Sequence, residues 1–554
     1  MPELPRTADL NCRFCEINMN TLSNSPFFLP PHQENASGVD YLGMRAINLQ
    51  LMDDLLPGLN NVARHIRPFA LLCWTIWIYE AQKRRDGAKL SSIEFTRFRE
   101  KIECLYVHSH RVAEYPIGGI AGVGQSTDLP DRVQLKFKEF GREPNNTLMN
   151  AVTYGPGLKG DSGYQFAYAI GGAPGCFAVT PAGANLAIAF DERLQEALTD
   201  DRYNFLCSTS EMAIDKEDAA EFAEAWDIAE PTAAEKRAFF VRFHPDGKVG
   251  EYGSREKARS VMLDYILGAL REAGKPMPLD QLRHVMTLGA ISQTPADQLP
   301  AKLQWRVLQL RQAQRLATEA LFGWLERCIW DGARITSQFI ELMKAALRDS
   351  RPTWSIDTAV ADLMSNFASL AQDSDGLFNY ASAHPDCALV EMTRALEDEC
   401  GSLSRNDEVV ARAIELLALV GVHTEHFLRN VALSPYVISG ALRRMPLHWL
   451  ATTMRSLAAL NFERFAETVI ETWLISQHLG VAASRVAGEG GKIRLSIDDA
   501  GITSLLPAAT KCWSPGLSAD RLAVALSLLA ECGKIDMFEG KDDEMLYGFR
   551  DTRR

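Results

Sequence analysis

Residues 522–549, "LAVALSLLAECGKIDMFEGKDDEMLYGF", decide how the end of this chain folds. Leu522, Leu526 and Leu529 recur at the spacing of one helix face, and Gly533 then ends the helix. Two short apolar segments follow, separated by the charged residues "EGKDDE", which is the pattern of a two-stranded hairpin. A helix, a glycine stop and a hairpin together predict a small α+β unit of the winged-helix type.

The charges of this predicted unit bear on what it contacts. Its hairpin tip, residues 539–544, is mostly acidic with one lysine, Lys541, and a single cation, Arg521, stands at the start of its helix. Winged-helix units that read DNA use Lys and Arg side chains to contact phosphates, and these contacts supply most of the affinity. The acidic tip therefore favours a protein-binding or scaffolding role for this hairpin over DNA reading.

The length of the chain predicts several domains, and its charge is uneven. A chain of 554 residues is too long for one hydrophobic core, so three or four folded units are expected. The net charge of −13 is unlike that of a protein that coats nucleic acid, which is basic overall. Residues 40–143 nevertheless carry 15 Lys and Arg against 13 Asp and Glu, whereas residues 191–230 carry 3 against 13. Any contact with a polyanion is therefore expected in the first of these regions.

The order of patterns along the chain predicts a mainly α, multi-domain helical array with small winged-helix-like α+β units. One such unit is expected near residues 90–195, where the strand-like "CFAV" runs into a helix capped by Thr180, and the other at the C-terminus. The expected divisions are an extended arm at 1–38, a helical domain with Gly-rich loops at 39–200, an acidic linker at 201–230, an α-helical array at 231–460 and a C-terminal winged-helix-like domain at 461–554.

Cysteine usage and hydropathy predict a cytoplasmic protein. The eleven cysteines are scattered, and several lie within apolar helical runs, where Cys acts as a small hydrophobic residue. No apolar signal segment is evident near Met1. The most apolar run, Pro68–Tyr79, has twelve residues, whereas a membrane-spanning helix needs about 20. This run is expected to be a buried helix.

Cations interleaved with apolar residues form the candidate nucleic-acid-binding set. The alternative is a solvated helix surface, because acidic residues such as Glu80 and Glu94 lie among them. A second row of cations, at Arg306, Arg311 and Arg315, is expected on a partner-facing or exposed surface. The candidate DNA-contacting residues are Arg64, Arg67, Lys83, Arg84, Arg85, Arg97, Arg99, Lys136 and Lys138.

No complete catalytic or cofactor motif is present. "GIAGVGQS", residues 119–126, has the spacing of a phosphate-binding loop, but Gln125 stands where the lysine is needed. Cys12 and Cys15 form half of a zinc site, and only the fold could bring His32, His108 or His110 to them. We expect no cofactor, with zinc at Cys12 and Cys15 as the one weak candidate.

The stretch "YLGMRAINLQLMDDLLPGLNNVARHIRPFALLCWTIW" and the segments "ETWLISQHLGVAASR" and "DRLAVALSLLAECG" resemble bacterial proteins of multi-gene anti-phage defence or mobile-element loci. The resemblance covers roughly residues 40–80 and 470–535 and carries no catalytic residues. It implies an accessory subunit that works beside an ATPase, helicase or nuclease. Two hypotheses follow, namely a non-enzymatic adaptor that docks a partner and possibly DNA, or a nuclease with its site in residues 116–175, using Asp131 or Asp161.

Overall fold

The computed structural model describes residues 40–114, 130–140, 147–150, 153–159, 163–245, 253–288, 294–370, 389–402, 404–438, 440–486, 493–505, 514–541 and 544–550. Within these ranges the chain is mainly helical, which confirms the predicted fold class. None of the helices in these ranges combines the length and the apolar character needed to cross a membrane. The predicted arm at 1–38 lies outside the described residues.

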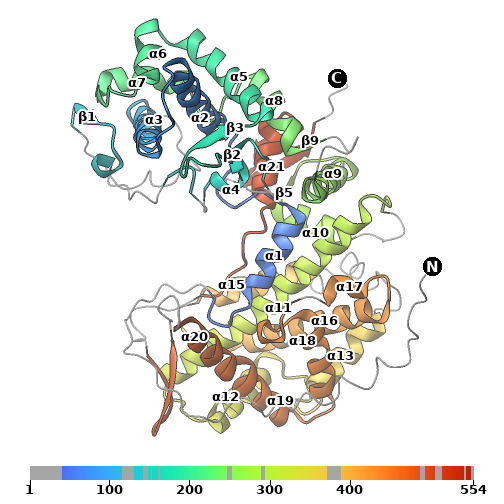
Figure 1. The fold of residues 1–554 in the computed structure, drawn as a ribbon. Coiled ribbons are helices and arrows are strands. Elements are labelled where there is room, and N and C mark those ends of the chain that lie inside the picture. The colour runs from blue at the N-terminus through green and yellow to red at the C-terminus, as the bar shows by residue number, and fades with distance from the viewer. Residues whose placement is uncertain are drawn as a thin grey trace.

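The ribbon has two lobes (Figure 1). The first, which we call the mixed lobe, holds all but one of the described two-stranded ribbons and the three-stranded sheet. Its elements are α2 (Arg67–Arg85), α3 (Ser92–Val112), β1 (Arg132–Gln134), η1 (Phe137–Phe140), α4 (Gly155–Lys159), β2 (Ala167–Ala169), β3 (Phe177–Val179), α5 (Pro181–Ala197), α6 (Asp200–Cys207), β4 (Ala213–Asp215), α7 (Lys216–Ala225), α8 (Ala233–Phe243), α9 (Ser254–Ala273), β5 (Met277–Pro278), α10 (Leu279–Thr287), α21 (Leu522–Glu531), β8 (Ile535–Glu539) and β9 (Met545–Phe549).

The second lobe, which we call the helical lobe, is built around one long helix, and α1 (Arg45–Leu55) connects it to the mixed lobe (Figure 1). Its elements are α11 (Leu299–Trp330), α12 (Thr336–Ser350), α13 (Ala359–Leu370), α15 (Leu389–Cys400), α16 (Glu408–Arg429), α17 (Ser434–Val437), η4 (Leu442–Arg444), α18 (Leu447–Ala458), α19 (Phe462–Thr468), the π-helical η5 (Val469–Ser476), α20 (Gln477–Val486), β6 (Leu495–Asp498) and β7 (Gly501–Ser504).

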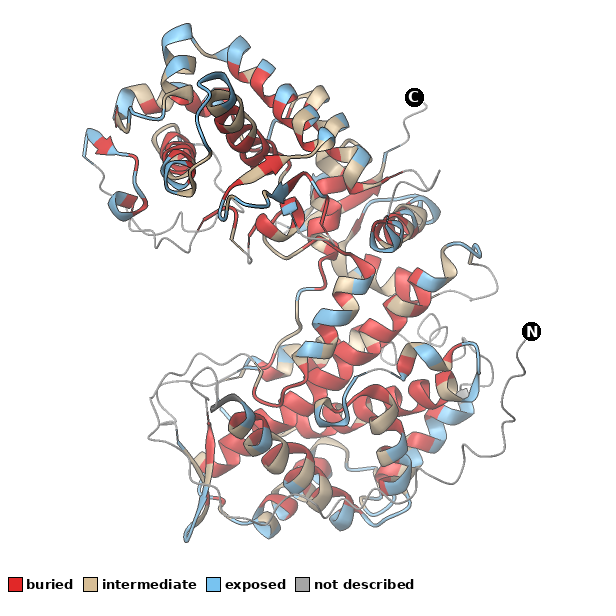
Figure 2. Cartoon of the chain, in the orientation of Figure 1, coloured by how far each residue is buried: buried red, intermediate tan, exposed pale blue. Residues whose placement is uncertain are grey.

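Each lobe has its own apolar core, and α11 belongs to both. Trp305 and Leu308 pack in the core of the mixed lobe, whereas Leu310 and the apolar residues after it pack in the core of the helical lobe. Burial is nearly continuous along α11 (Figure 2), whose 32 residues span about 48 Å. The two lobes therefore share one rigid helix.

The basic row on α11 is not a surface feature, so the expectation for Arg306, Arg311 and Arg315 was wrong. Arg306 and Arg311 are fully buried and Arg315 is 3% exposed. Arg306 Nε donates to the carbonyl of Thr287, and Arg315 pairs with Glu319 at 2.8 Å. Helical spacing alone cannot reveal this burial, because the carbonyls of Thr287 and Gly516 that accept from Arg306 and Arg315 come from other segments of the chain.

The apolar run Pro68–Tyr79 forms most of α2 and is buried except for the half-buried Trp77, as predicted. Phe69 packs edge-to-face against Tyr154 and Tyr164 at ring distances of 4.9 and 5.3 Å. Such pairs stabilise beyond the area that they bury. The Gly-rich region that follows α3 in sequence therefore supplies aromatic residues to the core around α2.

The three-stranded sheet joins segments that are far apart in sequence. Its order is β5-β9-β8, with Met277 opposite Tyr547 and Ile535 opposite Phe549. The helix, glycine stop and hairpin predicted from residues 522–549 are all present, and Gly533 has a φ of 70°. The sheet also needs β5, which lies within the region that we assigned to the helical array. Identification of this unit as a winged helix stays a prediction.

The remaining expected divisions also differ from the structure. The domain expected at 461–554 is divided, because Phe462, Trp473 and Leu495 pack in the core of the helical lobe whereas α21 packs in that of the mixed lobe. Residues 201–230, expected to be a linker, form α6, β4 and α7 and bury Leu206, Phe222 and Trp226 in the core of the mixed lobe. Acidic residues on the exposed sides of these helices explain the charge that suggested a linker. Near residues 90–195, β1 pairs with β4 and β2 with β3 as separate ribbons, so the second winged-helix-like unit is not confirmed.

We predict that Leu526→Ala lowers the free energy of unfolding by about 2–5 kcal/mol, because Leu526 is fully buried and alanine leaves a cavity. The neighbouring change Ser527→Ala is the control, with an expected effect within about 0.5 kcal/mol, since among the described residues that hydroxyl bonds only to the carbonyl of Ala523 in its own helix. Urea denaturation followed by circular dichroism measures both. Equal effects of the two changes would mean that α21 is not part of the core.

Candidate functional site

The predicted nucleic-acid-binding residues do not form one surface. Arg67, at the start of α2, is 1% exposed, and its Nε lies 3.1 Å from Glu235 Oε1, which is fully buried. Arg67 also donates to the carbonyl of Ala225 at 3.0 Å and lies over the ring of Phe190. It is a core residue that joins α2, α5 and α8, and it cannot contact a phosphate.

The other cations flanking α2 lie at its two ends. Arg64 precedes the helix and is exposed, whereas the cluster Lys83, Arg84 and Arg85 closes it. Because α2 has 19 residues, the two groups are about 28 Å apart. Within the cluster Lys83 pairs with Glu94 at 2.7 Å, and Arg84 pairs with Glu80 in its own helix.

A smaller basic patch remains around the middle of α3. The backbone N–H of Phe137 donates to Glu100 Oε1 at 2.5 Å, which places Lys136 and Lys138 beside the turn of α3 that carries Arg97. These three cations are exposed. Arg99, on the same helix, is half-buried and lies 3.5 Å from Glu103. We call Arg97, Lys136 and Lys138 the basic patch.

The remaining predicted candidates are only partly within the described residues. Cys12, Cys15 and Asp161 lie outside them. Asp131 is exposed, and its carbonyl accepts a hydrogen bond from the N–H of Lys216. His108 is buried in α3, and burial lowers its pKa to about 4. Among the described side chains, no group of three or more His, Cys, Asp or Glu is placed to hold a metal ion.

The cysteines in the described ranges are free thiols, and most are buried. Burial raises the pKa of Cys328 and of Cys400 to about 12, and desolvation likewise raises that of Cys73. A thiol with such a pKa is protonated at neutral pH and is a poor nucleophile. These residues therefore act as small hydrophobic side chains, as their sequence context predicted.

The helix of the C-terminal unit has no exposed residue. All ten residues of α21 are buried or half-buried, and Arg521, the cation at its start, pairs with Asp53 at 2.5 Å. At the other end, Glu531 accepts hydrogen bonds from the His65 ring at 2.5 Å and from the N–H of Ile66 at 2.7 Å. Glu531 thus caps the N-terminus of α2, where a carboxylate is favoured. A helix packed in this way cannot enter a DNA groove.

The two strands that follow α21, β8 and β9, form what we call the C-terminal hairpin. Within the described residues β8 pairs only with β9, so its other side is an open sheet edge. On this edge strand Met537 is 38% exposed and Phe538 is 45% exposed. Glu539 and Glu544 near the tip are also exposed. An open edge with apolar side chains is a surface on which another chain can add a strand.

Two hollows on the mixed lobe could also hold a ligand or partner. A cavity of about 430 Å³ lies between α9, α10 and the start of α11, with Val285 and Leu288 among its apolar walls and Lys302 at one side. A groove of about 370 Å³ lies between α5 and α8. We call it the α5–α8 groove, and its lining residues are Asn185, Ile188, Ala189, Glu192, Ala234, Arg237, Ala238 and Val241.

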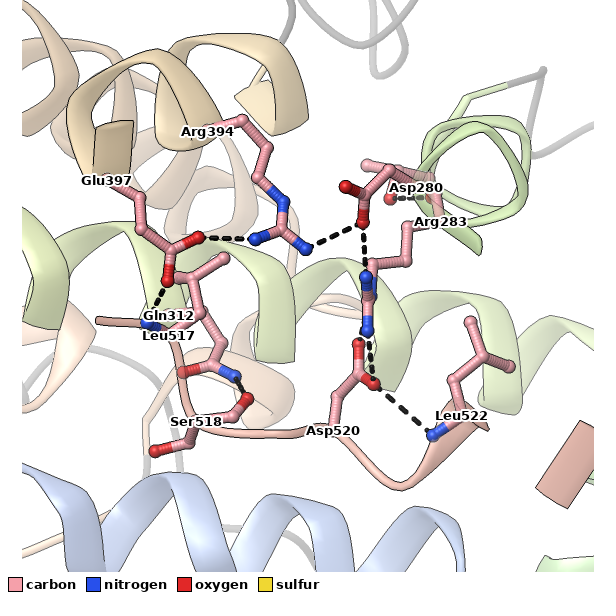
Figure 3. A network of polar contacts seen from close by, with 10 residues as sticks. Asp280, Arg283, Gln312, Arg394, Glu397, Leu517, Ser518, Asp520 and Leu522 are labelled. Atoms are coloured by element: carbon pink, nitrogen blue, oxygen red, sulfur yellow. Dashed lines mark hydrogen bonds and ion pairs between the residues drawn. The ribbon is translucent and has the colours of Figure 1, made fainter. Parts of the chain in front are cut away.

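The residues between the helical lobe and α21, 514–521, are held by a network of charged and polar contacts (Figure 3). Arg283 of α10 binds both carboxylate oxygens of Asp520, at 2.7 and 3.1 Å. Asp280 accepts from Arg283 and from Arg394 of α15. Burial alone would raise the pKa of Asp280, but the hydrogen bond from Arg394 and the charge of Arg283 lower it overall.

Further contacts in this network fix the backbone of the same segment. The carboxylate of Glu397 accepts from the N–H of Leu517 at 2.6 Å, and the side chain of Gln312 donates to the carbonyl of Ser518 at 2.6 Å (Figure 3). Every charged group drawn there has a partner from another element or its own helix. This arrangement joins the lobes and is best explained as structural.

Sequence reasoning missed the apolar residues that the structure leaves exposed. In α5, Leu186, Phe190 and Leu194 follow the buried face, and Ile188 falls outside that spacing. Val241 stands in the same relation to Phe239 and Phe243 of α8. An apolar residue that does not lie on the apolar face of its helix was therefore the sequence feature that could have indicated these exposed positions.

Comparison with known proteins gives no relative for this chain, since no family model, curated protein or solved structure matches it. The resemblance to proteins of anti-phage and mobile-element loci thus stays a prediction. Any functional conclusion has to come from the surfaces described above.

We predict that Arg67→Ala lowers the free energy of unfolding by about 3–5 kcal/mol, because it leaves the buried carboxylate of Glu235 without its cation. Arg64→Ala, three residues earlier at an exposed position, is the control, with an expected effect within about 0.5 kcal/mol. Chemical denaturation of the two purified variants provides the comparison. A small effect for Arg67→Ala would contradict the burial of Arg67 and would make it a candidate for DNA contact again.

Proposed function

We propose that this chain is a non-enzymatic accessory subunit of a bacterial multi-protein system in the cytoplasm, and that it docks a partner protein through the C-terminal hairpin. The observation that carries the proposal is the contrast between α21, which has no exposed residue, and β8, which exposes Met537 and Phe538 on an open sheet edge. The resemblance noted in the sequence supports an ATPase, helicase or nuclease of an anti-phage defence locus as the partner.

The chemistry of the edge specifies what kind of segment fits. Strand addition supplies backbone hydrogen bonds along β8, while side-chain contacts supply the specificity. Phe538 offers an apolar contact, and Glu539 and Glu544 place negative charge at the tip. A partner strand with an apolar residue followed by Lys or Arg matches this pattern. The shared helix α11 would carry such a docked partner at a fixed position relative to the helical lobe.

The double change Met537→Asp and Phe538→Asp should reduce partner association at least about tenfold, because it places charges on the docking edge. The matched control is Ile497→Asp, at a residue of β6 that is 62% exposed on a different ribbon. The measurement is affinity purification of the full chain co-expressed with the products of its flanking genes. Deletion of residues 513–554 is unsuitable, since α21 would be lost from the core.

Retention of the partner by the double variant would contradict docking at β8. Loss of the partner in the Ile497→Asp control as well would point to a general effect of added charge. Circular dichroism melting curves for the variants establish that both chains are folded before association is compared.

We infer that DNA, if it belongs to the same assembly, is contacted by the basic patch. Each phosphate contact contributes about 0.9 to the slope of log affinity against log salt on duplex DNA. The triple change Arg97→Glu, Lys136→Glu and Lys138→Glu removes up to three such contacts. It should therefore flatten that slope by up to about 2.7. The control is Arg64→Glu, at an exposed residue that precedes α2 and lies outside the basic patch. This change should leave the slope unchanged. Fluorescence anisotropy with a labelled duplex across a salt series measures it; an unaltered slope in the triple variant would exclude the patch.

A further inference from the structure

The α5–α8 groove exposes apolar side chains between two packed helices. Ile188 is 41% exposed on α5, and Val241 is 55% exposed on α8. Between them, Ala189, Ala234 and Ala238 line the groove. Small side chains at its base leave room for the larger side chains of another helix to pack between the two walls.

The two helices run in opposite directions. Arg67 contacts both Phe190, in the middle of α5, and Glu235, in the first turn of α8. At the other end of the groove, Arg242 near the end of α8 donates to the side chain of Gln165 at 3.0 Å. The carbonyl of Gln165 accepts from Thr180, the N-cap of α5, at 2.8 Å. The start of α5 therefore lies beside the end of α8.

Opposite charges stand on the two walls. Glu192 of α5 and Arg237 of α8 both line the groove and are exposed. The antiparallel arrangement puts them toward the same end, where Glu235 also lies. Within the described residues neither side chain forms an ion pair with another residue. Each wall thus carries the charge that is complementary to the other wall.

We propose that this groove is the interface of a homodimer. A two-fold rotation about an axis along the groove places α5 of one copy over α8 of the other and keeps the same end of the groove together. Ile188 then packs against the second copy's Val241, and Glu192 faces the second copy's Arg237. In such an isologous interface each contact occurs twice. Because complementary charges lie on the two walls of a single chain, they are satisfied most directly by a second copy of that chain.

The size of the groove sets the expected strength of the dimer. The shorter helix, α8, has 11 residues and is about 17 Å long. Two adjacent helices are about 20 Å wide, so the face that they form covers about 340 Å² per copy. Stable interfaces bury about 800 Å² of each partner. The dimer is therefore expected to be weak and to form only as the protein concentration rises.

Sedimentation velocity of the full chain over a concentration series tests the proposal. The wild-type chain should shift from monomer to dimer with concentration. Glu192→Arg and Arg237→Glu should each weaken dimerisation about tenfold, because each places two like charges opposite one another in both symmetry-related contacts. The double exchange, carrying both changes, should restore the dimer to within about threefold of the wild type.

The control is Glu217→Arg, an equal charge reversal at an exposed residue of α7 outside the groove, which should leave dimerisation unchanged. Val241→Asp should abolish the dimer through the apolar contact. A wild-type chain that stays monomeric throughout the series would overturn the proposal. So would a dimer that is insensitive to the groove variants, or a double exchange that behaves no better than the single changes.

Discussion

The guanidinium of Arg311 lies fully buried where three segments of the chain meet. It donates to the carbonyl of Met44 at 3.0 Å and to those of Arg444 and Met445 at 2.7 and 2.5 Å. Burial lowers its pKa to about 9, and these hydrogen bonds offset part of the cost of burying the cation. These carbonyls must therefore stay in place, which fixes the entry of the chain into the helical lobe against α11.

The same constraint recurs along α11. Arg315 donates to the carbonyl of Gly516 at 2.6 Å, and Glu326 pairs with Arg494 through two contacts of 2.8 and 2.7 Å, with both side chains 2% exposed. Burial raises the pKa of Glu319 to about 7, despite the opposing effect of Arg315. A helix can be buried on all sides and still carry charges because segments distant in sequence supply the partners. The long helix then serves as the common axis of both lobes.

Local signals predicted the helices better than they predicted the surfaces. Thr180 caps α5 as expected, and Ser91 and Thr232 cap α3 and α8 in the same way, because a cap depends on residues only three positions apart. The pairing of β5 with β9 and the burial of Arg67 depend on partners more than 150 positions away, which spacing cannot reveal. The exposed Ile188 was likewise hidden, since exposure is known only once the opposite helix face has found its core.

The position of α21 in the mixed lobe has a consequence for synthesis on the ribosome. Most residues of that core have been synthesised once the ribosome has passed Leu308. Leu522, Leu526 and Leu529 belong to the same core but are synthesised much later. Translation at about 5–20 residues per second needs roughly 10–40 s to cover the 213 residues between Leu308 and Leu522. During that interval the helical lobe can fold on the emerged chain while the apolar surface that receives α21 stays uncovered. In a nascent chain the mixed lobe is therefore completed last, when α21 arrives to cover that surface.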